Sequence, residues 1–272
     1  MKAVVYSSTG PASQVLRLVE RDVPEPGPGE VRVKVAFSGV NPIDSMLRRD
    51  GVPSFAEVVP HHDGSGVVDA VGSGVERLRL GQRVWLREAA FRRPGGTAQE
   101  YTVVPAHLAT VLPDGVSLET GAAIGIPAMT AHRALTVHED APPRLGPDVL
   151  SGATVLVAGG TGAVCHASIQ LARWAGAQVV ATVRTDMKGD LARAAGAHHV
   201  VNRHTADTAA AIRDLAPDGV DVIVEMAPVA NASLNAAVAR NHGCVAVYAD
   251  LGSDGGDLAL PVGRHMFCAT SS

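Results

Sequence analysis

The feature that most constrains this chain is a glycine-rich turn between an apolar run and a helical pattern. The run at 153–158 has the length and composition of a buried strand, and it leads directly into Gly159-Gly160-Thr161-Gly162. Glycines let the backbone approach a diphosphate closely, and the first N–H groups of the following helix are free to donate. A turn in this context predicts a binding site for a dinucleotide, whereas the same glycines outside it would indicate only a tight turn.

Strands and helices alternate through the C-terminal part of the chain. The predicted strands are 153–158, 178–183, 199–202, 220–225 and 244–248, and the predicted helices are 162–175, 187–195, 205–215 and 230–240. Gly176 and Gly196 follow the first two helices, as residues that end helices do. This alternation predicts an α/β fold with a doubly wound parallel sheet of the Rossmann type.

The N-terminal part has a different character. It carries short β-prone runs at 2–6, 15–23, 30–38, 66–72, 83–86 and 100–104, separated by turns such as 24–29, and almost no long helical pattern. We therefore expect a mostly antiparallel β domain over 1–121 and the dinucleotide-binding domain over 122–272. The segment 117–137 is predicted to be helical and to bridge the domains, and 138–150 is predicted to be a Pro-rich surface loop.

Composition excludes several classes of partner. The formal charge of -4 gives no reason to expect a nucleic acid or an anionic membrane. No apolar stretch approaches the roughly 18 residues of a membrane span. Three widely spaced cysteines make neither a disulfide framework nor a metal knuckle. We expect a cytoplasmic protein whose partner is a small molecule.

Basic residues follow the second and third predicted strands. An NAD site places an acid near the end of the second strand, but here the strand runs into Arg184, with Lys188 and Arg203 beyond. Arginine binds a phosphate through two parallel hydrogen bonds, and lysine acts as a point charge. The pattern favours NADP, and the alternative is that these side chains are ordinary solvated bases.

Cys165 occupies the third glycine position of the turn. That position needs a small residue so that the helix can pack against the strand, and a cysteine could cost on the order of 1–3 kcal/mol there. One interpretation is a reactive thiolate at the start of a helix. The other is a tolerated small residue.

Several motifs in order resemble the zinc-independent, zeta-crystallin-like quinone oxidoreductases of the medium-chain dehydrogenase/reductase superfamily. The matching segments are Gly39-Val40-Asn41-Pro42-Ile43-Asp44, Gly64-Ser65-Gly66-Val67-Val68 with Val71-Gly72, Gly81-Gln82-Arg83-Val84, Gly121 to Ala131, the glycine turn, and Gly219 to Glu225. The resemblance covers nearly all of the chain. It implies a GroES-like β domain followed by a Rossmann domain, with the active site between them.

The resemblance also implies individual roles. Asn41 would lie beside the nicotinamide and the acceptor, with Asp44 on the same loop as a catalytic candidate or merely as a group that caps that loop. The other implied cofactor contacts are Met46, Thr130, Gly159, Thr161, Gly162, Ala163, Val164, Arg184, Lys188, Arg203, Asn231, Tyr248, Ala249, Asp250 and Leu251. The departures from the family pattern are Met46 in place of a pocket tyrosine, Arg203 in place of tyrosine or histidine, and Ala249 in place of glycine.

No metal is expected. Zinc-dependent relatives of the superfamily carry cysteine at the position of Asn41, histidine at that of His62 and cysteine near Ile126, and they have a cysteine-rich lobe that is absent between Val84 and Thr97. Only His62 remains, and one histidine does not make a three-ligand site. His61 and His62 are therefore interpreted as a polar pair near the cleft.

These observations predict an NADPH-dependent oxidoreductase that passes hydride to a quinone or conjugated enone. Two alternatives remain: an enoyl-thioester reductase of the same superfamily, and a non-catalytic NADPH-binding protein, which Met46 and Cys165 would favour. The resemblance also implies about 50 further residues beyond Ser272, including a strand that builds a homodimer in relatives. We therefore expect a shortened chain in which that dimer is doubtful.

Overall fold

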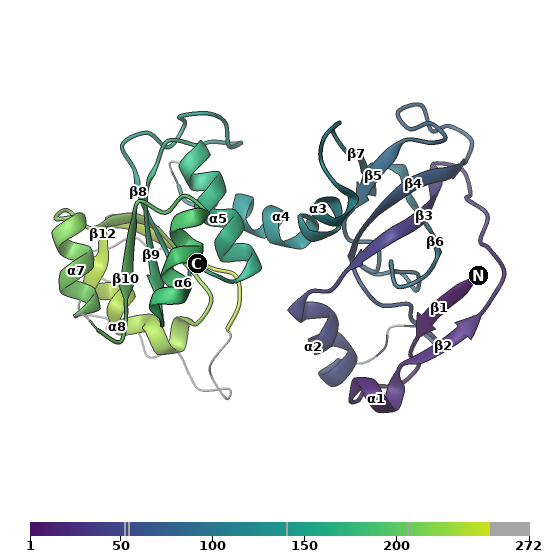
Figure 1. The fold of residues 1–272 in the computed structure, drawn as a ribbon, viewed down its shortest axis with the longest axis horizontal. Coiled ribbons are helices and arrows are strands. Elements are labelled where there is room, and N and C mark those ends of the chain that lie inside the picture. Colours follow the sequence, from purple (N-terminus) through teal and green to yellow (C-terminus); the bar gives the residue numbers. More distant parts are fainter. Residues whose placement is uncertain (52, 54, 140, 206, 251–272) are drawn as a thin grey trace. The chain divides into compact units, whose positions relative to one another are not determined.

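The computed structural model describes residues 1–250 with the exception of 52, 54, 140 and 206. Contacts divide the chain into two units, Met1–Ile126 and a second that begins at Pro127 (Figure 1). The predicted boundary between 121 and 122 falls inside the first unit, in the helix α3 (Leu118–Ala123), and the next helix, α4 (Gly125–Ala134), spans the division.

The first unit is built on an antiparallel sheet in the order β6-β3-β4-β5-β7. Its strands are β3 (Glu30–Gly39), β4 (Asp63–Val71), β5 (Arg83–Leu86), β6 (Tyr101–Pro105) and β7 (Ala109–Val111). A separate pair is formed by β1 (Lys2–Val5) and β2 (Arg17–Glu20). Buried valines and leucines of the sheet, among them Val31, Val68 and Leu86, form its core. The mostly antiparallel β domain is therefore confirmed.

The second unit is a parallel sheet in the order β10-β9-β8-β11-β12. Its strands are β8 (Thr154–Val157), β9 (Gln178–Val183), β10 (His199–Asn202), β11 (Val220–Glu225) and β12 (Ala239–Val247). Between them lie α5 (Ala163–Trp174), α6 (Asp186–Ala194), α7 (Thr208–Leu215) and α8 (Pro228–Val238). The strand order and the alternation of strand and helix are those of the Rossmann fold, as predicted.

Both faces of the parallel sheet are covered by helices (Figure 1). Val155 and Val157 of β8 pack in one core with Cys165 and Ile169 of α5. Leu156, between the two valines, points to the other face, where it packs in a core with residues of α7 and α8. Alternate residues of a strand point to opposite faces, and this is why the run at 153–158 is apolar without interruption.

Some expectations for the first unit are wrong. Asp44 was expected to lie on a loop with Asn41, but residues 42–50 form the helix α2 (Pro42–Asp50), which begins at the N-cap Asn41 with proline in its first turn. Ile43, Met46 and Leu47 are spaced as on one face of a helix, but the helix is only nine residues long and this face is partly exposed. The predicted strand at 15–23 is divided between the short helix α1 (Ala12–Val15) and β2.

The second unit also departs from expectation at two places. The strand β12 begins at Ala239, well before the predicted 244, because its register against β11 shifts between Val220 and Val222. The loop 138–150 does not lie wholly on the surface: Leu145 and Leu150 are buried in the core beside α5. An irregular pairing and a buried leucine in a loop leave no periodic signal in the sequence.

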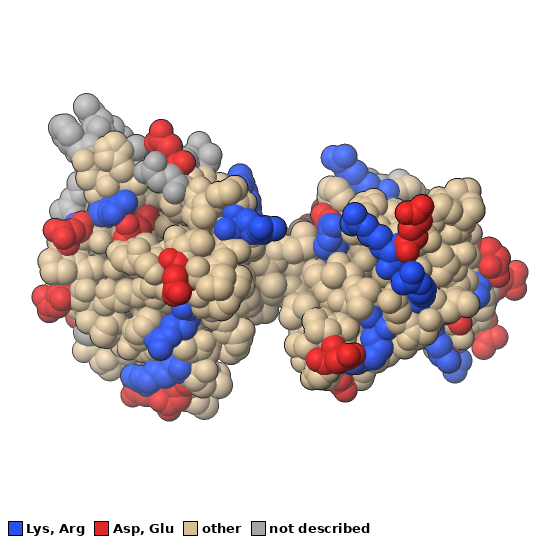
Figure 2. All heavy atoms as spheres, turned by 90° about the horizontal axis from the view of Figure 1, so that it is seen from above, with Lys and Arg blue, Asp and Glu red and all other residues tan. Residues whose placement is uncertain are grey.

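Among the described residues, no helix has the length and apolar character needed to cross a bilayer. On the face shown in Figure 2, basic and acidic side chains are interspersed.

We expect Leu156→Ala to lower the free energy of unfolding by about 2–5 kcal/mol, because it leaves a cavity beneath a fully covered strand. Met187→Ala removes a side chain that is 73% exposed in the same unit and should change stability by less than about 0.5 kcal/mol. Urea unfolding followed by far-ultraviolet circular dichroism measures both. Equal midpoints for the two variants would contradict this account of the core.

Candidate functional site

The turn between β8 and α5 is shaped by two glycines. Gly159 has φ +80, a left-handed conformation that side chains rarely adopt, and a Cβ atom there would lie 3.0 Å from Sδ of Met226. A Cβ atom on Gly160 would lie 3.0 Å from Cβ of Ala181 and 3.3 Å from Cβ of Ala192. The turn therefore packs directly on the neighbouring strand and on α6, and side chains at these two positions would push it away.

The first turn of α5 is open to an anion. Its N-cap is Gly162, which has no side chain to accept hydrogen bonds from the first N–H groups. Ala163 and Val164, both predicted cofactor contacts, lie in this first turn. Backbone donors and the positive end of the helix dipole point the same way, which is the arrangement that binds a diphosphate.

Cys165 is completely buried beneath this turn. Its Sγ donates to the carbonyl oxygen of Ala158 at 3.2 Å and lies 3.3 Å from the hydroxyl of Tyr248. Burial raises the pKa of the Cys165 thiol, and a nearby hydrogen bond with Tyr248 opposes that shift only in part. A thiol that is buried and protonated is not a nucleophile. This favours the interpretation of Cys165 as a packed small residue.

A groove of about 610 Å³ opens over the turn. It brings together seven of the predicted cofactor residues, which come from the ends of β8, β9, β10 and β11 and the segments that follow: Gly159, Thr161, Gly162, Arg184, Lys188, Arg203 and Asn231. The groove lies at the carboxyl ends of the parallel strands, which is where open α/β sheets bind ligands.

The basic residues of the groove have no ion-pair partner among the described residues. Arg184 follows β9 directly, Lys188 lies in the first turn of α6, and Arg203 follows β10. None of the three appears in an ion pair with a described carboxylate. Three unpaired cations lining one groove suit a phosphate group.

Glu225, at the end of β11, is a buried carboxylate held entirely by neutral donors. It accepts hydrogen bonds from the backbone N–H groups of Met226 and Ala227, both at 2.7 Å, and from the amides of Asn231 and Asn235 at 2.9 and 2.7 Å. These bonds offset the cost of burying the carboxylate and fix the segment that borders the groove.

Glu225 fixes the side-chain amide of Asn231 through its Nδ2 atom and leaves its buried Oδ1 atom without a hydrogen-bond partner among the described residues. Asn231 lines the groove and is only 3% exposed. A buried acceptor without a partner is costly, so a ligand that donates to it would gain affinity.

The remaining predicted residues of the second unit lie elsewhere. Thr130 and Tyr248 line a separate, largely apolar cavity of about 600 Å³ between α4 and β12. Ala249 and Asp250 follow Tyr248 outside any helix or strand, and Leu251 lies outside the described residues.

In the first unit, the start of α2 carries a buried polar cluster. Asp44 accepts from the backbone N–H of Asn41 and from Nδ1 of His62, both at 2.7 Å, so it caps α2 and also holds an imidazole. The expectation that Asp44 lies on a loop is wrong, because it occupies the first turn of a helix. Met46 is 45% exposed on the same helix.

Asp63, the first residue of β4, completes this cluster. Its Oδ2 atom accepts from Nδ2 of Asn41 at 2.9 Å and from the N–H of Ile126 at 2.7 Å, and its buried Oδ1 atom has no partner among the described residues. Burial raises the pKa of Asp63 from 3.8 to about 6, against the lowering effect of those two donors. Asp63 therefore fixes the orientation of the Asn41 amide.

The described residues contain no group of three histidine, cysteine, aspartate or glutamate side chains that could hold a metal ion. His62 is bonded to Asp44, and His61 contacts the hydroxyl of Ser38 at 2.8 Å. The histidine pair is thus divided between two different polar partners.

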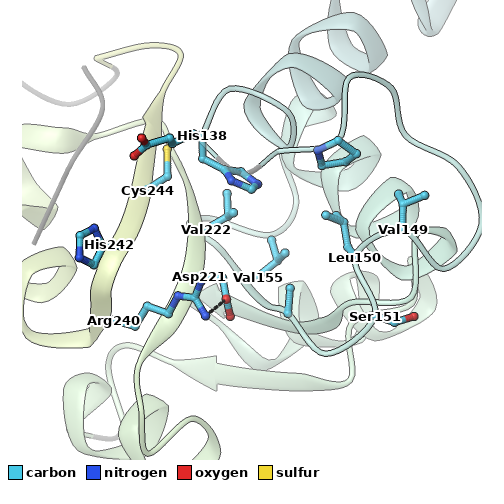
Figure 3. Close-up of a pocket in the computed structure, with 13 residues that line it drawn as sticks. His138, Val149, Leu150, Ser151, Val155, Asp221, Val222, Arg240, His242 and Cys244 are labelled. Atoms are coloured by element: carbon cyan, nitrogen blue, oxygen red, sulfur yellow. Dashed lines mark ion pairs between the residues drawn. The ribbon is translucent and has the colours of Figure 1, made fainter.

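A further cavity of about 370 Å³ lies at the opposite edge of the parallel sheet (Figure 3). It is bordered by the starts of β8, β11 and β12, and Arg240 and Asp221 form an ion pair in it. Because it lies at the amino ends of the strands, it does not extend the groove over the glycine turn.

Sequence reasoning missed two acids that organise these sites, Asp63 and Glu225. Asp63 begins β4 and Glu225 ends β11, and each acid directly adjoins small or apolar residues of its strand. That signal was available, but the partners of the two carboxylates are distant in sequence or lie in a helix whose orientation is not apparent from the sequence.

The comparisons with known proteins agree with this architecture. Residues 27–114 match the model of the alcohol dehydrogenase GroES-like domain, and residues 163–270 match that of the zinc-binding dehydrogenase family. The human quinone oxidoreductase is 33% identical over 259 residues, which cover 93% of this chain and 74% of the human protein.

Solved structures show the same relationship. A mycobacterial protein in complex with NADPH has a TM-score of 0.80 at 29% identity, covering 99% of this chain and 80% of that one. An NAD-dependent alcohol dehydrogenase has a TM-score of 0.85 at 29% identity, covering 98% and 82%. A GroES-like unit followed by a Rossmann unit defines the medium-chain dehydrogenase/reductase class. Within it, the chain belongs to the quinone oxidoreductase family, whose members are oxidoreductases.

The raised pKa of Asp63 predicts a pH-dependent stability. The native state keeps the proton up to about pH 6, whereas the unfolded chain loses it near 3.8. The native state therefore binds more protons in this window, and the contribution of Asp63 to stability falls as pH rises from about 4 to about 6. The free energy of unfolding of the wild type should therefore fall by roughly 1–3 kcal/mol over this window, and Asp63→Asn should remove that fall.

Urea unfolding at a series of pH values measures this effect. Asp114→Asn, at an exposed position of the same unit, serves as the control. If the free energy of unfolding of Asp63→Asn falls as much as that of the wild type between about pH 4 and 6, the raised pKa does not belong to Asp63.

Proposed function

We propose that the chain is an NADPH-dependent oxidoreductase that transfers hydride to a quinone or a conjugated enone without the help of a metal. The observation that carries the proposal is the groove over the β8–α5 turn. It combines an uncapped helix N-terminus, close backbone approach at Gly159 and Gly160, and three unpaired basic residues. The relatives named above supply the reaction class.

The residues present fit a dinucleotide that carries a 2′-phosphate. The first turn of α5 would bind the diphosphate, and Arg184, Lys188 and Arg203 would bind the 2′-phosphate. The partnerless Oδ1 atom of Asn231 would accept a hydrogen bond from the nucleotide. Since one structural neighbour is named for NAD and another was solved with NADPH, the choice of NADPH depends on these basic residues.

The acceptor class follows from what the site can offer. Bound NADPH supplies a hydride, and the protein then needs only to orient the acceptor and to stabilise the negative charge that develops on it. Quinones and conjugated enones are electron-poor enough to react without a Lewis acid. We propose that the amide of Asn41, held by Asp63, takes part in orienting the acceptor and the nicotinamide.

The proposal is tested by mixing the purified chain with NADPH and 1,4-benzoquinone and following the nicotinamide absorbance. Oxidation of NADPH that depends on both the protein and the quinone is expected. Turnover with acyl thioesters alone would indicate an enoyl-thioester reductase instead. NADPH binding without turnover of any acceptor would indicate a non-catalytic binding protein.

Replacing Arg184 and Arg203 by alanine should weaken NADPH binding at least about tenfold per residue, since a hydrogen bond to a charged group contributes about 1.5–3 kcal/mol. NADH, which lacks the 2′-phosphate, should lose much less. Arg193→Ala, on α6 and paired with Asp190, is the matched control and should leave both affinities unchanged. Calorimetric titration measures all of these affinities, and equal losses for NADPH and NADH would argue against a phosphate pocket.

A further inference from the structure

A small cavity inside the first unit is not used by any role assigned above. Its volume is about 210 Å³, and it is lined by three aromatic side chains and by basic or imidazole groups: Tyr6, Phe55, Phe91, His62, Arg92 and Arg93. It is smaller than the about 300–1,000 Å³ of sites that take drug-sized ligands. Aromatic walls around so small a volume suit a single planar ring.

The backbone next to this cavity is strained. His61 has φ +76, an uncommon conformation for a residue with a side chain. Both neighbours of His61 are fixed, because the carbonyl oxygen of Pro60 accepts from Ala98 at 3.2 Å and that of His62 accepts from Ala89 at 2.8 Å. As a result, His61 turns to Ser38, while His62 turns to α2 and lines the cavity.

His62 is held in the manner of a proton-transfer group. Its Nδ1 atom lies 2.7 Å from Oδ1 of Asp44, and the other carboxylate oxygen of Asp44 is fixed by the N–H of Asn41. Among the described residues, the hydrogen bond of the His62 ring is made by Nδ1, and the ring also lines the cavity. A carboxylate on one ring nitrogen sets the orientation of the imidazole and leaves the other nitrogen to act on a ligand.

We infer that this cavity binds the acceptor, a small one-ring quinone, and that Nε2 of His62 donates the proton that completes its reduction. The inference rests on the proposed function, and it identifies the proton donor which that function leaves open. Asp44 is a positioning residue, because it acts through His62.

The step balances as follows. The quinone receives a hydride, and with it two electrons, from bound NADPH, and one of its oxygens becomes anionic. The Nε2–H bond of protonated His62 breaks and an O–H bond forms on that oxygen, while Nδ1–H stays hydrogen-bonded to Asp44. A proton from the solvent then reloads His62, so that NADPH, one proton and the quinone give NADP⁺ and the hydroquinone.

Several charged or titratable groups surround His62 and bear on this step. Asp44 faces it from α2, Asp63 and His61 adjoin it in sequence, and Tyr6, Arg92 and Arg93 line the same cavity. Burial lowers the pKa of His61, so His61 is a poor competitor for the proton. Arg93 is engaged with the carbonyl oxygen of Val103 at 2.6 Å.

His62→Gln tests the proton donor, because glutamine keeps a polar side chain but cannot carry the proton. With NADPH and 1,4-benzoquinone, we expect kcat to fall at least about tenfold, within the range that a general acid contributes. NADPH affinity should stay unchanged, and the solvent deuterium isotope effect on kcat of the wild type should be lost. His61→Asn is the control, since asparagine tolerates positive φ, and it should keep kcat within about twofold.

A wild type that shows no quinone-dependent turnover would refute the proposed function itself. A wild type that turns over while folded His62→Gln keeps the same kcat and isotope effect would refute only the role of His62. If circular dichroism shows that His62→Gln is unfolded, Asp44→Asn replaces it, because the amide oxygen of asparagine can still accept from the N–H of Asn41. Asp44→Asn should lower kcat while NADPH affinity is kept, and an unchanged kcat would overturn the inference.

Hydroquinone binding to the nucleotide-free chain tests the cavity without turnover. Phe91 is 52% exposed, so Phe91→Ala should fold normally, and it should weaken the binding of 1,4-hydroquinone several-fold in calorimetry or ligand-observed NMR. Leu80→Ala, at a position that is 67% exposed and outside the cavity, is the control. Equal hydroquinone affinities for Phe91→Ala and Leu80→Ala, or no binding to the wild type, would contradict the assignment of the cavity.

Discussion

The close approach of backbone to backbone at the end of β8 is the constraint on which the rest of the second unit depends. Gly159 lets the turn approach Met226, and Gly160 lets it pack on β9 and α6; this packing sets where α5 begins and where its free N–H groups point. The groove and its basic residues are arranged around that point because the neighbouring parallel strands end at the same edge. A side chain at Gly160 would displace the turn and the anion site together.

Buried carboxylates organise both units by accepting neutral hydrogen bonds. Glu225 holds the segment that borders the groove and orients Asn231, and Asp63 orients Asn41 at the start of α2. Beside Glu225, the buried Oδ1 atom of Asn231 has no hydrogen-bond partner among the described residues, and in the first unit the same is true of Oδ1 of Asp63 itself. Such unsatisfied atoms are rare in folded proteins and often mark the places where a ligand or a proton is handled.

The sequence predicted those parts of the fold that leave a local or periodic pattern of residues. The β8–α5 turn, the alternation of strand and helix, and the basic residues after β9 and β10 all follow from local patterns. The helix α2 was missed because it is only nine residues long and lies in a part of the chain dominated by β-prone runs. The early start of β12 was missed because an irregular register leaves no periodic trace. The contacts of Asp63 and Glu225 were not accessible, since tertiary packing alone decides which amides meet a buried carboxylate.

The central claim is that the groove over the β8–α5 turn binds a reduced dinucleotide phosphate. Calorimetric titration of the folded, nucleotide-free chain with NADPH and, separately, with NADH tests it most directly. The structure predicts one NADPH bound per chain, with NADH bound more weakly. Absence of binding by either nucleotide to well-folded protein would contradict the account.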